Sequence, residues 1–195
     1  QAVGSGMLIE REHLLPLAAD GFDIVEVAFP TVNSLGCVKV RTNAYSVPVD
    51  SGRRVQAKIS PTTVEIWHEG HSVAIHERCY GQQQEVLNLD HYLDVLEHKP
   101  GAFRGSRPLA QWRQLGRWPD SYDRFWQGLM ERYGRQKGTK ELIELLQLGR
   151  VYGQERLRAA IESALGMGCG DSAAVRHLLT AHELAILQFV VTTHW

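Results

Sequence analysis

Residues 38–76 read VKVRTNAYSVPVDSGRRVQAKISPTTVEIWHEGHSVAIH, and this stretch decides the fold. Five short runs in it alternate apolar with polar residues, which is the period of a half-buried β-strand. Turn-forming residues such as Asp50-Ser51-Gly52 and Glu69-Gly70 separate the runs. Five strands with tight connections predict an antiparallel meander. Such a meander has one apolar face and two edges, so we expect it to curl into a small β-barrel.

Beyond Gly81 the spacing of apolar residues changes to three or four, which is typical of helices. The first helical pattern follows Asn88, a plausible N-cap, and stops at Lys99-Pro100-Gly101. A stronger pattern begins at Pro119-Asp120 and ends at Gly134, and three more follow it. The sequence therefore predicts an α+β fold, a small antiparallel β-barrel followed by a C-terminal α-helical region.

These patterns divide the chain into four segments. We expect an arm or linker over residues 1–35, the small β-barrel over 36–81, a helix plus a basic connector over 82–118, and the helical region over 119–195. The last part of that region, from residue 181 onward, is apolar and fits either a helix or a strand. The first residues, QAVGSG, lack both an initial Met and the features of a signal peptide, so we expect a segment of a longer protein.

Composition indicates an ordinary globular protein rather than a membrane or disulfide-rich one. Of the 195 residues, 44% are hydrophobic and 22% charged, and no apolar run approaches the ~20 residues of a membrane span. The three cysteines are far apart and include no CxxC pair, which argues against a zinc ribbon or a disulfide framework. We expect reduced thiols, a cytoplasmic location and no membrane partner.

Charge is distributed unevenly along the chain. Residues 1–100 contain 8 Lys/Arg and 13 Asp/Glu, whereas residues 101–195 contain 13 and 9, so the two halves carry about −5 and +4. Most of the basic excess lies between Arg104 and Lys140, where nine Lys/Arg face three Asp/Glu. This asymmetry predicts an anionic partner for the middle of the chain.

Motifs for catalysis or nucleotide binding are missing from the sequence. It contains no GxxxxGK[ST], GxGxxG or GxSxG pattern, and its predicted strands carry Glu65 as their one internal acid. His91, Asp94 and His98 could share one side of a helix, but their spacing is not that of a paired-histidine metal site, and solvated histidines explain it better. We therefore predict no catalytic residues and no metal or other cofactor in this chain.

Basic residues of the barrel and of the connector are the candidate DNA contacts. Arginine can donate two parallel hydrogen bonds to phosphate, and the connector interleaves its arginines with tryptophans. The alternative is a set of amphipathic elements with solvated basic faces. The predicted DNA-binding residues are Lys39, Arg41, Arg53, Arg54, Lys58, Arg104, Arg107, Arg113 and Arg117.

An ordered run of motifs resembles a known family. The stretches NSLGCVKVRTNAYSVP (33–48), HYLDVLEHKPGA (91–102) and RPLAQW (107–112) resemble the C-terminal half of IstA-type insertion-sequence transposases, which are relatives of phage Mu transposase and retroviral integrases. The resemblance covers about residues 10–180. It implies that residues 36–81 are a Mu-type β-barrel and that the catalytic DDE core, which uses a divalent metal, lies outside this chain.

The resemblance also implies a function and partners. It implies a non-catalytic segment that contributes duplex DNA binding and transpososome assembly in a bacterial, nucleoid-associated transposase. The partners it implies are transposon-end or target DNA, an AAA+ helper ATPase of the IstB type, and further copies of the full-length transposase. The alternative is a protein–protein module that docks the ATPase or a second transposase subunit and has little DNA affinity of its own.

Overall fold

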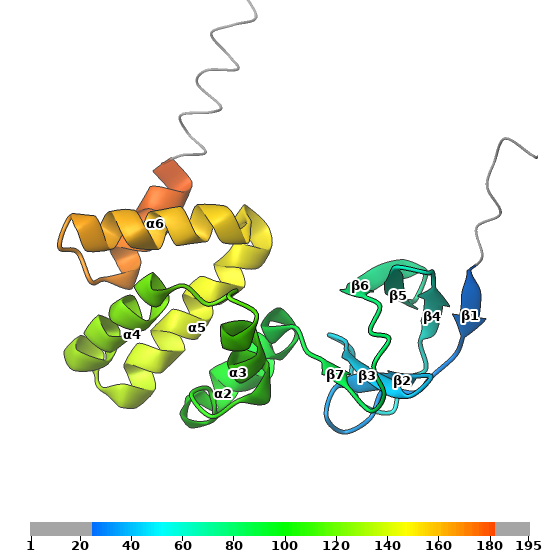
Figure 1. Cartoon of the computed structure of the whole chain (residues 1–195). Helices are drawn as coiled ribbons and strands as arrows, with labels where there is room; N and C mark the ends of the chain where they lie inside the picture. The colour runs from blue at the N-terminus through cyan, green and yellow to red at the C-terminus, as the bar shows by residue number, and fades with distance from the viewer. Residues whose placement is uncertain (1–24, 182–195) are drawn as a thin grey trace, which may run out of the picture.

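The computed structural model describes residues 25–181. They form an α+β structure in which short strands lie at one end and helices at the other (Figure 1). We call the strand-rich part, residues 26–86, the β unit, and the helical part, residues 89–181, the helical unit. Each unit has a hydrophobic core of its own. No helix in the described range is long and apolar enough to cross a membrane.

Two sheets make up the β unit. The first has the strand order β1-β4-β5-β6, in which all neighbours are antiparallel. The second has the order β2-β3-β7, in which β2 and β3 form an antiparallel hairpin and β7 is parallel to β3. The bounds are β1 Glu26–Ala28, β2 Cys37–Val40, β3 Asn43–Ser46, β4 Gln56–Ile59, β5 Thr63–His68, β6 His71–Glu77 and β7 Glu85–Val86.

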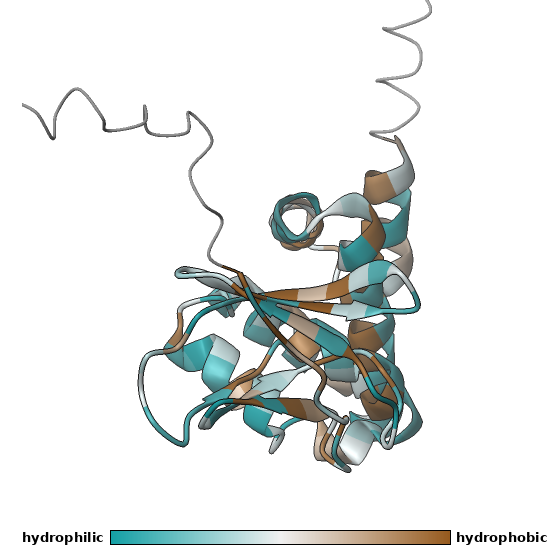
Figure 2. Cartoon of the chain, turned by 90° about the vertical axis from the view of Figure 1, so that its right-hand side faces the viewer, coloured by the Kyte–Doolittle hydropathy of each residue, from teal (hydrophilic) through white to brown (hydrophobic). Residues whose placement is uncertain are grey.

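Alternation predicts the core of the β unit well. Inward-facing side chains from both sheets meet in one cluster, where Val38, Tyr45, Ile66 and others are at most 2% exposed. The hydropathy colouring in Figure 2 shows this alternation of brown and teal along the strands. The two sheets thus share an interior, which is the layout expected when each has one apolar face.

The predicted meander is interrupted between β3 and β4. The second of the five alternating runs includes Val47 and Val49, but the strand ends at Ser46, and β4 pairs with β1 instead of β3. Pro48 lacks an N–H donor, so the ladder cannot continue through it, and the chain crosses to the other sheet. Among the described strands, hydrogen-bonded pairing does not run round a closed ring. Strand β1 also lies within the predicted arm, residues 1–35, and pairs with β4.

The helical unit begins with a short 3-10 turn, η1 (Leu89–Tyr92), which runs into α2 (Leu93–His98). Asn88 is the N-cap, as predicted, and its side chain accepts a hydrogen bond from the Asp90 amide at 3.1 Å. A second 3-10 turn, η2 (Pro100–Ala102), leads into the remaining helices. These are α3 (Arg107–Gln114), α4 (Asp120–Tyr133), α5 (Arg135–Tyr152) and α6 (Gln154–Gly166), followed by a helix over residues 172–181.

Aromatic residues dominate the core of the helical unit. The apolar side of α4 is buried, and the Phe103 ring lies 6.0 Å from that of Trp118 and 5.2 Å from that of Trp126, centre to centre. Gly134 ends α4 as predicted, with a φ of 82° that favours glycine. The α4–α5 crossing is so close at Gly138 that an added Cβ would lie 2.5 Å from the Leu129 carbonyl oxygen. The glycine-rich stretch around Gly168 is a turn between two helices. The predictions for residues 182–195 fall outside the described range.

Candidate nucleic-acid interface

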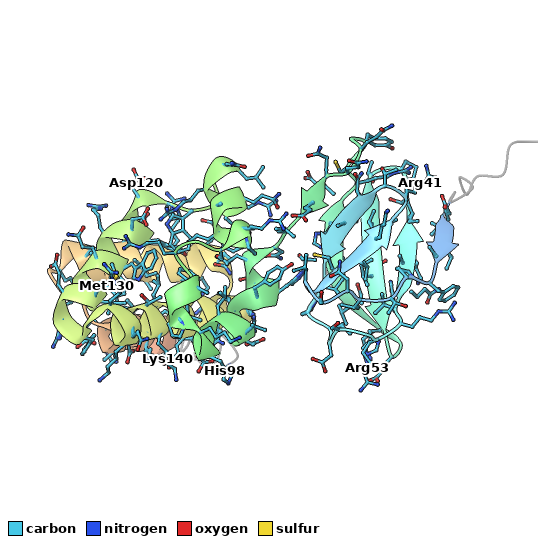
Figure 3. The ribbon with its side chains drawn as sticks, turned by 90° about the horizontal axis from the view of Figure 1, so that it is seen from below. Arg41, Arg53, His98, Asp120, Met130 and Lys140 are labelled. Carbon is cyan, nitrogen blue, oxygen red and sulfur yellow. The ribbon has the colours of Figure 1, made fainter. Side chains whose placement is uncertain are left out.

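The five predicted cations of the β unit do not form one patch. Lys39 is exposed on β2, Arg41 lies in the β2–β3 turn with a φ of 54°, and Lys58 is on β4. Arg53 and Arg54 lie in the loop before β4. Figure 3 shows Arg41 and Arg53 at opposite ends of the β unit. A single straight duplex contact therefore cannot be assigned to all five residues.

Two of these cations lie over aromatic rings. The Lys58 ammonium is 3.8 Å from the centre of the Trp67 ring, and the Arg54 guanidinium is 5.6 Å from that of Phe29. Both distances are within the range of cation–π attraction. The rings leave the charges unneutralised, so they remain available to an anionic ligand.

In the helical unit, the structure brings together two of the four predicted arginines. Arg104 and Arg113 line the same cavity, which has a volume of about 500 Å³. Arg117 lines a different cavity, of about 360 Å³, beside Trp112 and Tyr122. Arg107 points elsewhere and forms an ion pair with Glu85 of β7.

Ion pairing separates the nine predicted residues into two groups. Arg41 pairs with Glu26, Arg107 with Glu85, and Arg113 with Asp123. Within residues 25–181 the other six have no carboxylate within 4.0 Å. A cation that is not already paired with a carboxylate can neutralise a DNA phosphate with its full charge, so this second group is the better candidate for DNA contact. Its members are Lys39, Arg53, Arg54, Lys58, Arg104 and Arg117.

One cation that the sequence did not single out lies at the end of the β unit. Arg78 lies 4.8 Å from the centre of the Tyr80 ring, donates to the Ser60 carbonyl at 2.9 Å, and has no carboxylate partner among the described residues. With Arg41 it lines a cavity of about 240 Å³ that opens between the two sheets. The sequence signal for this cation was an arginine two residues before a tyrosine, Arg78 and Tyr80. The ERCYG stretch has neither strand nor helix periodicity, so the sequence could not predict where the arginine lies.

The two units meet through hydrogen bonds rather than through a shared core. The Ser46 hydroxyl accepts the Asn88 amide at 2.9 Å and is 2.9 Å from Nδ1 of His91. The Ser46 carbonyl is 2.7 Å from Nε2 of His76, and the two imidazole rings are in edge contact. Gln111 adds a bond from Nε2 to the Glu85 carbonyl at 2.7 Å. These contacts tie β3, β6 and β7 to η1 and α3.

Burial keeps the histidines of this junction neutral. Burial is the main cause and the neighbouring His76 the second cause of a shift that lowers the pKa of His91 from 6.5 to about 4. Burial also lowers the pKa of His76. Both rings therefore serve as neutral hydrogen-bonding groups near pH 7, and His91 is not the solvated surface histidine that the sequence suggested.

The three side chains whose spacing weakly suggested a metal site, His91, Asp94 and His98, do not converge in the structure. His91 points into the junction, Asp94 pairs with Arg150 at 3.0 Å, and His98 uses Nδ1 to reach the Asp94 carbonyl at 2.7 Å. Within residues 25–181, no group of three His, Cys, Asp or Glu side chains is placed to hold a metal ion. The described residues thus offer no set that fits the divalent metal implied by the resemblance.

The sequence is similar to transposases along most of its length. The family model described as Mu transposase, C-terminal domain, matches residues 17–88. A transposase for insertion sequences IS1326/IS1353 from Pseudomonas aeruginosa is 28% identical over 92% of the chain. A putative transposase for insertion sequence IS408 from Burkholderia multivorans is 29% identical over 89% of it, and a transposase from Aminobacter aminovorans is 28% identical over 73%.

The alignments cover only part of these relatives. The chain spans 34%, 33% and 27% of the three proteins, respectively. No solved structure matches the chain significantly. The similarity therefore supports a transposase C-terminal region, and it extends from the β unit into the helical unit.

Proposed function

We propose that this chain is a non-catalytic DNA-binding and assembly segment of an IstA-type transposase. The observation that carries the proposal is the continuity of the similarity, which runs through 89–92% of the chain in two insertion-sequence transposases. The residues that align with these transposases include both units and the junction between them. Strand transfer belongs, in this proposal, to a metal-dependent DDE core elsewhere in the complete protein.

Duplex DNA is the proposed ligand. The unpaired cations occur on both units, and three of them lie against aromatic rings: Arg54, Lys58 and Arg104. Such cations can bind phosphate without first breaking an ion pair. A paired cation must lose its carboxylate partner before it can bind a phosphate. Closure of the β unit into a Mu-type barrel and a nucleoid-associated, cytoplasmic location are further parts of this proposal.

A titration of fluorescently labelled duplex DNA with the chain tests the proposal. We expect saturable binding at 50 mM salt that weakens strongly at 200 mM, because bound Lys and Arg side chains displace condensed counterions. The comparison is a variant in which the six unpaired cations are changed to Gln. This variant should bind the duplex much more weakly than the wild-type chain does. Equal binding by both proteins would contradict the DNA part of the proposal.

Docking of another protein is the second candidate. Three of the nine predicted cations are neutralised by acids, which lowers the expected DNA affinity. The helical unit also exposes large apolar side chains, with Leu115 59%, Met167 58% and Val151 78% exposed. The partner in this case is an AAA+ helper ATPase of the IstB type or a second transposase subunit. Binding to purified ATPase, combined with undetectable binding to duplex DNA, would favour this candidate.

A further inference from the structure

The cavity shared by Arg104 and Arg113 has a composition suited to a nucleic-acid backbone. It lies where the connector before α3, α3 itself and the outer face of α4 meet, and Met130 marks it in Figure 3. Its volume is about 500 Å³. The lining residues are Arg104, Arg113, Asp123, Trp126, Gln127 and Met130.

Arg104 is held in place without being neutralised. Its guanidinium carbon lies 5.0 Å from the centre of the Trp126 ring, and a terminal nitrogen is 3.8 Å from the Met130 sulfur. Trp126 is itself fixed, because it is only 3% exposed and its Nε1 donates to the Thr139 hydroxyl at 2.9 Å. A guanidinium that lies over a fixed ring loses little further freedom when it binds an anion.

Arg113 approaches the cavity from the other side. Its guanidinium lies 5.8 Å from the centre of the buried Trp118 ring and pairs with Asp123. The carboxylate of Asp123 occupies one side of the guanidinium fork, as a phosphate oxygen would. Asp123 therefore competes with any anion that enters the cavity.

We propose that this cavity is a phosphodiester clamp, in which Arg104 and Arg113 hold a backbone phosphate, Trp126 holds Arg104 in place, and the partly exposed Met130 side chain contacts the adjoining sugar. The inference rests on the proposed DNA-binding function and names its contact on the helical unit. A nucleic-acid backbone alternates charged phosphates with less polar sugars, and the cavity likewise sets two guanidinium groups beside an apolar wall. An isolated carboxylate would use the arginines but not that wall, so we favour a phosphodiester over an acidic peptide.

Substitution of the arginines is the first test. Arg104→Gln and Arg113→Gln in the full chain should each weaken binding to a 20-base-pair duplex about tenfold. Each should also make the slope of log K against log salt shallower by about 0.9, which corresponds to one phosphate contact. Arg135→Gln is the matched control, because it removes the same charge from an exposed site at the start of α5, away from the cavity. Circular dichroism and thermal unfolding verify that each variant is folded.

Removal of the competing acid is the second test, and its expected sign is opposite. Asp123→Asn should tighten duplex binding three- to tenfold, because it frees Arg113. Asp120→Asn removes the same charge from the first turn of the same helix, and it should change affinity less than twofold. Equal effects of Asp123→Asn and Asp120→Asn would overturn the clamp.

An NMR titration separates the clamp from the proposed function. Diethyl phosphate should shift the Trp126 indole and Arg104 Nε signals in the wild-type chain, whereas Arg104→Gln should abolish the indole shift. If the chain binds duplex while Arg104→Gln and Arg113→Gln behave like Arg135→Gln, the clamp is wrong and DNA binding stands. If diethyl phosphate shifts these signals but no duplex binds, the clamp holds a phosphodiester from another source and the DNA function fails. Equal shifts with acetate would indicate a carboxylate ligand and overturn the proposal.

Discussion

The β unit and the helical unit are built in different ways. The β unit has strands of two to seven residues and a core made mostly of Val, Ile and Ala, whereas the helical unit has helices of up to 18 residues and a core rich in Trp, Phe and Leu. The two cores share no residue, and the junction between them is made of hydrogen bonds, one ion pair and one contact between histidine rings. Each unit should therefore respond to its own core mutations, while the junction controls how the two are oriented.

The largest predicted effect comes from emptying the helical core. Phe125 is fully buried in α4, so Phe125→Ala should cost about 3–5 kcal/mol of unfolding free energy. Amide hydrogen exchange should show the loss of protection over residues 93–166 and a change below about 1 kcal/mol in the β unit. An equal loss in both units would mean that they unfold as one body. Phe29→Ala is the control, because that ring is 56% exposed on the β unit.

A smaller effect is expected where α4 crosses α5. Gly138→Ala would place a methyl group 2.5 Å from backbone atoms of α4, and we expect a cost of about 1–3 kcal/mol. Gly128 lies within α4 and has no atoms within 4 Å of an added Cβ, so Gly128→Ala should stabilise the protein by up to about 1 kcal/mol. Chemical denaturation of the two variants measures this difference. Similar stabilities would show that the crossing is looser than described.

Acidification tests the junction. The pKa of His91 is about 4 in the folded chain, below its ordinary value of 6.5, so the unfolded chain takes up the proton first as the pH falls. Stability that is present above pH 6.5 is then lost toward pH 4, and about 2 kcal/mol should be lost between pH 7 and pH 5. Denaturation at both pH values measures the loss. A His91→Gln variant should show a flatter dependence, and an unchanged slope would contradict the assignment to His91.

The smallest predicted change in stability concerns a surface ion pair of the β unit. Glu26 and Arg41 are both at least half exposed, so Glu26→Gln should change the unfolding free energy by less than about 1 kcal/mol. It should nevertheless tighten duplex binding about two- to threefold, because it frees Arg41. Glu77→Gln is the control, since Glu77 is exposed on β6 and has no described ion pair. Weaker binding by Glu26→Gln would mean that Arg41 needs its partner.

The strands and helices could largely be predicted from periodicity, because each has one face in a core. Val64 and Ile66 alternate with polar residues in β5, and Tyr122, Phe125 and Leu129 follow the helical period in α4, as the structure confirms. Helix α5 begins at Arg135, immediately after α4, because Gly134 ends one helix and is the N-cap of the next. The pairing of β1 with β4 was not predictable, because three residues at the edge of a sheet carry little pattern.

The candidate site was less predictable than the fold. Sequence alone selects basic residues but does not show which of them an acid already neutralises. Arg107 and Glu85 are 22 residues apart, and their pairing depends on how α3 packs against β7. The convergence of Arg104 and Arg113 likewise depends on how both side chains pack against α4. His91 was taken for a solvated surface residue because its helical position gave no sign that β3 would cover it.

The salt dependence of duplex binding by the intact chain tests the central claim most directly. Six predicted cations are unpaired, and each phosphate contact contributes about 0.9 to the slope of log K against log salt, so we predict a slope between about −2 and −5. The measurement is fluorescence anisotropy with a labelled duplex from 50 to 200 mM salt. A slope shallower than about −1, or no binding at 50 mM, would contradict the account and favour protein docking.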